Sequence, residues 1–427
     1  MKDFEIPGHL EVRDGHLFIG GADTVKLAKD FGTPLYVTSE DRLRENYRRF
    51  AKAFHGAKIY FAAKSNNNVV IQKILAKEGA GADAFSDGEI FLARMAGIPA
   101  NKILFTGNSK TDAELESAVN TGVMVSVDSH DELIALSAIA DRLNREVKIA
   151  FRVNPDISAG AHPKLATGLK ISKFGIPRDE IISIYKEAND LPAVIPAGIH
   201  CHIGSQILET APYTEATNKM MDLVEQISGF VDLEFVDIGG GFGIPYEKNV
   251  KVPTPHEWAD AIMPVFKDRC KKLGIHPELH LEPGRYIVAD TTVLLMHVNT
   301  VKQASKNFVG TDAGFNTLIR PAMYDSYHEA VVANKADSEA ADTYTIVGPI
   351  CESGDILAKD RKLPAIQKGD TVALLDAGAY GYCMSSQYVG RPRCAEVLVH
   401  HGKPELIRKR ETYDDLLQNQ LIPGRLL

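Results

Sequence analysis

Cysteine is scarce in this chain, and its few cysteines are scattered. They stand at Cys201, Cys270, Cys351, Cys383 and Cys394 of the 427 residues. No two of them have the spacing of a metal-ligand pair, and a sparse, odd-numbered set does not suit a disulfide framework. The scarcity therefore predicts a protein of a reducing compartment with no metal site.

Long apolar runs and an excess of basic charge are also missing. No stretch is apolar over the ~20 residues that a membrane-spanning helix needs, and the N-terminal MKDFEIPGHLEVRDG lacks the apolar core of a secretory signal. The formal net charge of −8 argues against nucleic acid or an anionic membrane as the main partner. We expect a cytoplasmic protein.

The middle of the chain alternates short apolar strands with amphipathic helices. A length of 427 residues exceeds one ordinary core, so two domains are expected. The strands are KIYFAAK, GADAFS, KILFTGN, MVSVDS, VKIAFRVNP, AGIHCHIGS, EFVDIGGG and ELHLEPGR. Eight such strands over roughly 250 residues predict an α/β fold of the (β/α)8, or TIM, barrel type.

Helical signals lie between these strands as apolar residues at helical spacing, capping pairs and stop glycines. They are Val70, Ile71, Ile74 and Leu75 before Gly79; the capping pairs Thr111–Glu114 and Ser129–Glu132; Pro177 as an opening residue; and Trp258, Ile262, Val265 and Phe266 before Gly274. Helical segments thus alternate with the strands, as expected for such a barrel.

Both ends of the chain have β character. Residues 10–19 form two short runs joined by Asp14-Gly15, a favoured hairpin turn. From Tyr286 onward the pattern is again β, with a last hairpin turning at His401-Gly402. We divide the chain into N-terminal strands at 1–35, a barrel at 36–285 and a C-terminal all-β domain at 286–427, which the N-terminal strands join.

The C-terminal ends of the predicted barrel strands are unusually polar. In order they offer Lys64; Asp83 and Ser86; Asn108; Asp128 and Ser129; Arg152 and Asn154; His202 and Ser205; Gly239-Gly240-Gly241; and Glu282 with Arg285. Active sites of such barrels lie at these ends. The pattern therefore predicts a single mouth that holds a lysine, a histidine, several acids and a phosphate-type loop.

Each of these residues has a functional and a structural interpretation. Lys64 would suit a Schiff-base lysine, although a solvated lysine after a strand is commoner. Gly239-Gly240-Gly241 and Arg285 follow strands seven and eight, where such barrels bind phosphate, but tight turns also explain glycines. Glu282 could hold a proton on a cofactor ring nitrogen, or pair with Arg285. His202 could lie over a planar cofactor, or be an ordinary core histidine.

The segment from Ile157 to Ile171 has no apolar periodicity. It is long for a loop between a strand and a helix, and long loops at barrel mouths are often active-site lids. The alternative is an insertion without a function. We expect a lid.

A series of motifs makes the chain recognisable. They are YFAAKSNNN, GADAFSDGE, ILFTGNSK, HCHIGSQ, DIGGGFGIPY, EPGRYIVAD, DAGFNTLIRPAMY, GPICESGDILAKD, DAGAYGYCMSSQY and RPRCAEVLV. In this order they resemble the diaminopimelate decarboxylases and, less closely, the wider group of barrel-type pyridoxal-phosphate decarboxylases that act on ornithine and arginine. The resemblance runs from about residue 30 to 410.

The resemblance implies a role for each matching residue. Lys64 would bond to pyridoxal 5'-phosphate with Asp83 beside it, His202 would stack on the ring, and Glu282 would face the ring nitrogen. The phosphate side would be formed by Ser205, Gly240, Gly241 and Tyr380, and Pro283, Gly284 and Arg285 would complete the loop after Glu282. Arg285, Arg320, Tyr324 and Tyr380 would contact the substrate, together with Cys351, the proton donor, and Glu352, both supplied by the partner in a homodimer with shared active sites.

The expected reaction is decarboxylation of meso-2,6-diaminopimelate to L-lysine, the last step of lysine synthesis. Alternatives are a decarboxylase of the same fold acting on ornithine, lysine or carboxynorspermidine, a racemase on the same barrel, and a non-catalytic pyridoxal-phosphate carrier. Arg320 and Tyr324 favour a substrate with a second carboxylate. The chain departs from the family pattern at Ser65, at Ile171-Ser172 in the lid and at Cys394.

Overall fold

The computed structural model describes residues 9–158 and 172–426, which form two compact units. One unit comprises the described residues of 44–245 and 249–287. The other comprises residues 9–43, 246–248 and 288–426. The predicted lid, Ile157 to Ile171, falls almost wholly outside the described residues.

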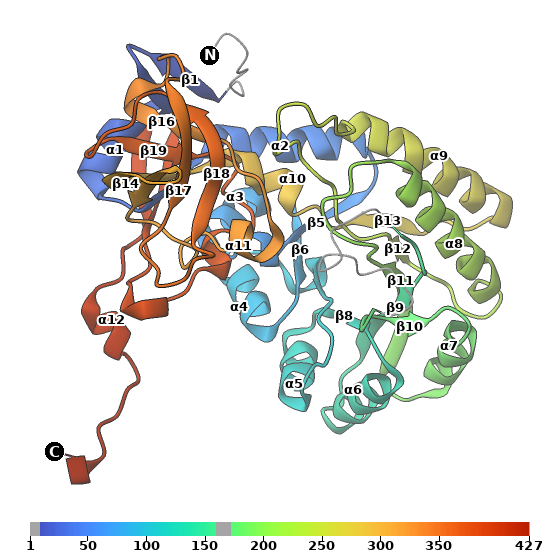
Figure 1. Cartoon of the computed structure of the whole chain (residues 1–427). Helices are drawn as coiled ribbons and strands as arrows, with labels where there is room; N and C mark the ends of the chain where they lie inside the picture. Colours follow the sequence, from blue (N-terminus) through green and yellow to red (C-terminus); the bar gives the residue numbers. More distant parts are fainter. Residues whose placement is uncertain (1–8, 159–171, 427) are drawn as a thin grey trace. The chain divides into compact units, whose positions relative to one another are not determined.

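The first unit is a closed parallel barrel. Its strands are β5 (Lys58–Ala62), β6 (Gly81–Ala84), β7 (Ile103–Phe105), β8 (Met124–Val127), β9 (Val147–Asn154), β11 (Val194–Cys201), β12 (Phe235–Asp237) and β13 (Glu278–Leu281). They pair in chain order, β13 pairs with β5, and so the ring closes. All eight predicted strands are present, and the predicted barrel is confirmed (Figure 1).

Helices surround this barrel (Figure 1). They are α2 (Glu40–Ala53), α3 (Val69–Glu78), α4 (Asp87–Met95), α5 (Asp112–Thr121), α6 (His130–Arg142), α7 (Ile181–Asp190), α8 (Ala211–Ile227), α9 (Pro255–Leu273) and the short α10 (Arg285–Val288). Inside the ring, Tyr60, Leu104, Ala150, Ala197 and Phe235 form one apolar cluster. Above such a layer a barrel can present polar side chains at its mouth.

Most sequence signals for the helices are confirmed, with two corrections. Gly79 and Gly274 end α3 and α9 in the left-handed conformation, and Thr111 forms a complete capping box. Ser129 caps α6, but the Glu132 carboxylate binds Lys110 at 2.6 Å and does not close the box. Pro177 does not open a helix: it lies in the two-residue strand β10 (Ile176–Pro177), and α7 begins at Ile181.

The second unit is built mainly of β-strands. A sheet runs in the order β18 (Ile356–Leu363), β17 (Asp342–Val347), β15 (Asn307–Thr311), β14 (Thr292–Gln303), β4 (Leu35–Ser39), β20 (Ala395–His400) and β21 (Lys403–Arg408), with β19 (Thr371–Leu374) between β14 and β16 (Ala330–Val332). Short helices are α1 (Thr24–Phe31), α11 (Arg320–Tyr324) and α12 (Tyr413–Leu417). The strand predicted from Tyr286 begins later, at Thr292, because α10 and a 3-10 turn precede it.

The N-terminal strands pack into this second unit, as predicted. β1 (Leu10–Arg13), β2 (His16–Ile19) and β3 (Ala22–Asp23) form a small antiparallel sheet. Leu10, Leu17 and Ile19 share a buried cluster with Val37 and Leu295 of the large sheet. Strand β4, which the sequence places at the start of the barrel domain, pairs here with β14 and β20. The proposed domain limits, 1–35, 36–285 and 286–427, stay a prediction.

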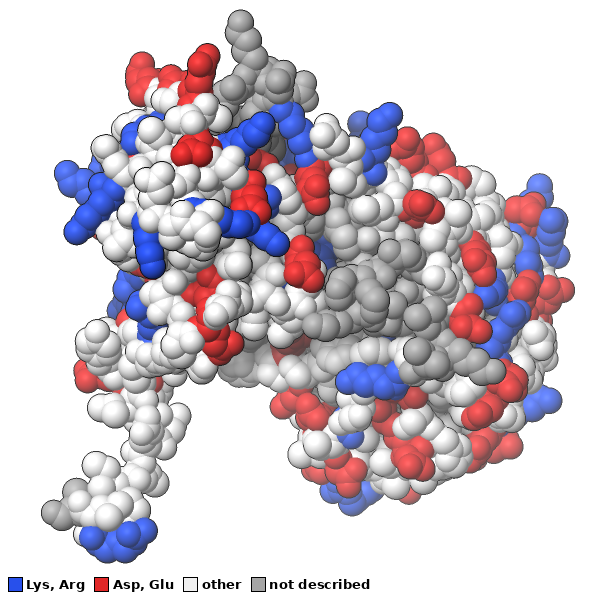
Figure 2. Space-filling model, viewed as in Figure 1, with Lys and Arg blue, Asp and Glu red and all other residues white. Residues whose placement is uncertain are grey.

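The described surface carries charges of both signs. On the face drawn in Figure 2, Lys and Arg side chains are interspersed with Asp and Glu side chains. Among the described helices, none is both long enough and apolar enough to cross a bilayer.

Candidate active site

Lys64 and Asp83 form an ion pair at the ends of adjacent strands. Lys64 lies in the 3-10 turn that follows β5, and the register pairs Ala62 with Asp83 on β6. The Lys64 Nζ contacts the Asp83 Oδ2, and the Thr106 hydroxyl donates to the Asp83 Oδ1. Burial and the nearby Glu282 raise the pKa of Asp83, against the attraction of Lys64. The Lys64 amine thus lies beside a buried carboxylate with which it can share a proton.

Glu282 follows β13 as a buried carboxylate. Burial acts to raise its pKa, but His200, Lys64 and His202 outweigh burial and hold the pKa of Glu282 well below its usual range. Its Oε1 atom is shielded from water and makes no hydrogen bond of good geometry in the described structure, although the His200 Nε2 lies 3.4 Å away. A buried, ionised carboxylate oxygen with such weak hydrogen bonding is costly. The arrangement suits a bound cationic N–H group.

His200 contacts Glu282 from within the barrel and was not among the predicted site residues. Its Nε2 lies 3.4 Å from the Glu282 Oε1, and its Nδ1 lies 2.7 Å from the hydroxyl of Ser126. All three side chains are buried. A signal was available: His200 lies near the end of β11 and His202 follows two residues later, a spacing that places side chains of an extended segment on one face.

His202 presents a neutral ring at the mouth. Burial, together with Lys64 and Arg152, lowers the pKa of His202 to about 3. The backbone N–H of Gly240 donates to its Nδ1 at 3.2 Å. An uncharged, oriented imidazole can stack on a flat aromatic ligand, which supports the predicted role of this residue.

The glycine loop after β12 leaves no room for side chains. A Cβ on Gly240 would collide with the carbonyl oxygen of Glu282, and one on Gly241 would collide with that of Gly204. Gly241 also has a φ of 95°, which other residues rarely adopt. Only glycine therefore lets this backbone approach both the neighbouring loops and an anion closely.

Ser205 and Arg285 add polar groups to this end of the barrel. The Arg285 Nη2 donates to the Ser205 Oγ at 2.9 Å, and the guanidinium is buried. The preceding Pro283 accepts a hydrogen bond from Ala62 N at 3.3 Å, and a Cβ on Gly284 would lie 2.9 Å from the Ala62 side chain. Strand β5 thus fixes the loop that carries Glu282 and Arg285.

The ten barrel residues predicted for the site all belong to this unit. They are Lys64, Asp83, His202, Ser205, Gly240, Gly241, Glu282, Pro283, Gly284 and Arg285. The other five, Arg320, Tyr324, Cys351, Glu352 and Tyr380, belong to the β unit and are described within it.

Arg320 is the buried cation of the second group. Its Nη1 lies 2.7 Å from the His328 Nε2, and the His328 Nδ1 lies 2.8 Å from the carbonyl oxygen of Leu375. Its guanidinium also lies 4.4 Å from the ring centre of Tyr246. The carbonyl requires the His328 proton on Nδ1, so Nε2 accepts from Arg320. When one edge of a buried guanidinium is held by a protein group, another edge can still donate hydrogen bonds to a carboxylate.

Cys351 and Glu352 lie on an exposed loop that a buried acid organises. Asp355 accepts the backbone N–H groups of Ile350 at 2.8 Å and Phe315 at 2.6 Å. Glu352 accepts a hydrogen bond from the Tyr388 hydroxyl at 2.7 Å. The sequence named the two exposed residues of this loop but missed Asp355, because its role depends on backbone groups that are far apart in the chain.

The departures Ser65 and Cys394 are both buried. The Ser65 hydroxyl donates to the Ala62 carbonyl at 2.7 Å, so it needs no further partner. Cys394 lies in the core of the β unit, where burial raises the pKa of its thiol to about 12. Neither change removes a predicted site residue.

Comparisons with known proteins agree with this geometry. The family model described as pyridoxal-dependent decarboxylase, pyridoxal binding domain, matches residues 40–289. A diaminopimelate decarboxylase of Archaeoglobus fulgidus is 53% identical, covering 97% of this chain and 99% of the relative. That of Methanothermobacter thermautotrophicus is 48% identical, covering 98% and 99%.

A solved structure is similar over the whole chain. Diaminopimelate decarboxylase from M. jannaschii in complex with L-lysine superposes with a TM-score of 0.93. It is 39% identical in sequence, and the superposition covers 98% of this chain and 99% of the other.

Proposed function

Because this chain belongs to the diaminopimelate decarboxylases, within the pyridoxal-dependent decarboxylases, we propose that its barrel mouth decarboxylates meso-2,6-diaminopimelate to L-lysine and CO2. The observation that carries the proposal is the buried, ionised Glu282, whose Oε1 makes no hydrogen bond of good geometry, in the same mouth as Lys64. A carbonyl cofactor with a cationic ring nitrogen would use both groups.

The barrel residues fit pyridoxal 5'-phosphate. Lys64 would hold the cofactor covalently, the Glu282 carboxylate would keep the ring nitrogen protonated, and His202 would stack on the ring face. Ser205, Gly240 and Gly241 would bind the phosphate, a role that the family resemblance also gives to Tyr380. When bound, pyridoxal phosphate supplies an electron sink for the electron pair of the breaking carbon–carboxylate bond.

The protein's own groups orient the substrate and move protons. The mouth would hold the scissile carboxylate in the orientation that its loss requires. Cys351 would then donate a proton to the carbon that has lost CO2. Lys64, beside the buried Asp83, can exchange its proton as the product leaves.

Arg320 supports a substrate with a second carboxylate. Its buried guanidinium would pair with the distal carboxylate, with help from Arg285 and Tyr324. A substrate without that group, such as ornithine, lysine or carboxynorspermidine, would lack this charge-assisted contact with Arg320. These substrates are therefore much less well supported than diaminopimelate. A non-catalytic carrier is supported less still.

Two features of the assembly belong to the same proposal. The exposed loop of Cys351 and Glu352 would serve the mouth of a second copy, so the active form would be a homodimer with shared sites. The five free cysteines suit a reducing compartment, and we propose that the enzyme is cytoplasmic.

The deciding experiment measures lysine release by the purified protein with added pyridoxal phosphate. meso-2,6-Diaminopimelate is compared with L-lysine, L-ornithine and carboxynorspermidine as substrates. We expect turnover of diaminopimelate at least about a hundredfold faster, in kcat/KM, than of any other. Turnover of another amine precursor alone would keep the cofactor and overturn the roles of Arg320 and Tyr324; no turnover at all would overturn the activity.

A further inference from the structure

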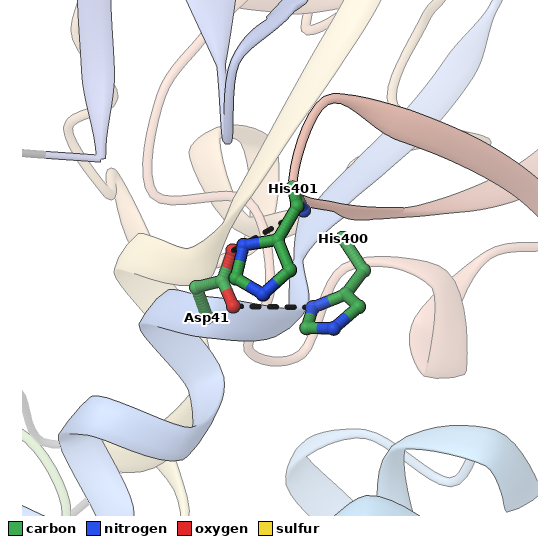
Figure 3. A group of neighbouring side chains, drawn as sticks. All are labelled: Asp41, His400 and His401. Carbon is green, nitrogen blue, oxygen red and sulfur yellow. Dashed lines mark hydrogen bonds and ion pairs between the residues drawn. The ribbon is translucent and has the colours of Figure 1, made fainter.

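Three side chains of the β unit converge on one point of its surface (Figure 3). Asp41 is the second residue of α2, His400 is the last residue of β20, and His401 begins the turn to β21. Consecutive side chains of a strand normally point to opposite faces. Here His401 has a φ of 48°, and the two imidazole rings lie side by side, with ring centres 3.9 Å apart.

The donor atoms have the spacing of a metal site. The His400 Nδ1 lies 3.1 Å from one Asp41 oxygen, and the His401 Nδ1 lies 3.5 Å from the other. One donor atom from each residue lies within 4.8 Å of the others. Tetrahedral zinc, with bonds of about 2.0–2.1 Å, separates its ligand atoms by roughly 3.3 Å. Both distances are close to that value, and each ring faces a different oxygen of the Asp41 carboxylate.

The cluster combines one carboxylate with two imidazole rings, and both kinds of group bind divalent transition metals. The His400 Nδ1 is shielded from solvent and makes no hydrogen bond of good geometry, although it points at Asp41. A metal ion would accept the lone pairs of both rings and the carboxylate together.

We propose that Asp41, His400 and His401 bind one divalent transition-metal ion, with Zn²⁺ favoured by the two imidazoles and one carboxylate. The His401 side chain is 75% exposed, which leaves an open side for water as the fourth ligand. The ion would join the start of α2 to the β20–β21 hairpin. It would stabilise the β unit by mass action and take no part in decarboxylation.

The test is metal binding to the chelator-treated holoenzyme, measured with Zn²⁺ by calorimetry and with Co²⁺ by visible absorption. We compare wild type with His401→Asn, because asparagine tolerates the left-handed backbone of this turn, and with Asp41→Asn. The matched control is His16→Gln, since His16 also pairs with an acid, Asp23 at 3.0 Å, but within the described part of the chain no second histidine joins this pair.

Wild type and His16→Gln should bind one Zn²⁺ per chain, with a tetrahedral Co²⁺ spectrum and a Tm that rises with added zinc. His401→Asn and Asp41→Asn should bind at least about tenfold more weakly, and His401→Asn should keep the wild-type decarboxylation rate. The proposal is wrong if wild type binds no stoichiometric metal, if His401→Asn binds it equally well, or if His16→Gln loses it to the same extent.

Discussion

Lys64 and Lys58 flank the same barrel strand and provide a matched pair of substitutions. Lys64→Ala removes the amine that would bond to the cofactor, and we expect decarboxylation to fall roughly a thousandfold or more. Lys58, which pairs with Glu278 at 3.2 Å on the exposed surface, serves as the control. Its replacement by alanine should leave kcat within about twofold, since exposed pairs contribute little. Substantial remaining turnover in Lys64→Ala would contradict the proposed role.

Gly240 provides a test of the phosphate loop. Gly240→Ala places a Cβ against the Glu282 carbonyl oxygen, so the loop must shift, and we expect pyridoxal phosphate to bind at least about tenfold more weakly. Gly229→Ala is the control, because a Cβ there meets no atom within 4 Å. Cofactor affinity is read from the absorbance of the bound chromophore. Equal affinity in the two variants would remove Gly240 from the cofactor site.

Individual residues were predictable where their chemistry stands out at a strand end. Lys64 and Glu282 are charged residues that follow apolar strands, and the pattern alone marks them. His200 and Thr106 were missed because they act through other side chains: one contacts Glu282 and the other binds Asp83. Such roles depend on which strands are neighbours in the closed barrel.

At the scale of single elements, strand β13 carries a histidine that should make stability depend on pH. His280 is buried, with its ring stacked on Phe235 at 4.4 Å between ring centres and tilted against Tyr60. Burial lowers the pKa of His280 to about 4, although Glu278 acts to raise it. In the unfolded chain the pKa would be near 6.5.

Between these two pKa values the unfolded chain binds a proton that the folded chain does not. The free energy of unfolding should therefore fall as the pH falls from about 6.5 to about 4, by on the order of 3 kcal/mol for this residue. His280→Phe keeps the stacked ring and should flatten this dependence in urea unfolding, whereas replacement of the exposed His256 by glutamine should not. An unchanged pH dependence in His280→Phe would refute the prediction.

Helix ends show which features the local sequence can predict and which it cannot. Gly79 and Gly274 end their helices as predicted, because a left-handed residue is a local backbone requirement. Ser129 and Glu132 look like the pair Thr111 and Glu114, yet Glu132 binds Lys110 from another part of the barrel. The Glu132 carboxylate therefore forms a tertiary ion pair, although the local pattern predicted that it would cap the helix.

At the scale of the whole molecule, the proposed homodimer can be tested by mixing two inactive variants. Lys64→Ala and Cys351→Ala each damage a different part of a shared site. If Cys351 serves the partner's barrel, subunit exchange should restore up to about a quarter of wild-type activity, since half of the dimers would carry one intact site. Cys351→Ala alone should keep cofactor binding.

The matched control mixes Lys64→Ala with Glu282→Gln, both from the barrel. No exchange can then build an intact site, and activity should stay at the level of the separate variants. Recovery in this control, or none in the first mixture despite proven subunit exchange, would contradict sites shared between subunits.

The sequence by itself determined the barrel, the β unit and the family, because strand alternation, turn glycines and long ordered motifs are properties of neighbouring residues. It also indicated Lys64, Glu282 and the glycine loop, since a parallel barrel gathers all its strand ends at one mouth. Only the tertiary structure decided that β4 joins the sheet of the β unit, that His200 contacts Glu282, and that Asp41 meets His400 and His401. These facts depend on contacts between distant segments, which burial and strand pairing fix only in the folded chain.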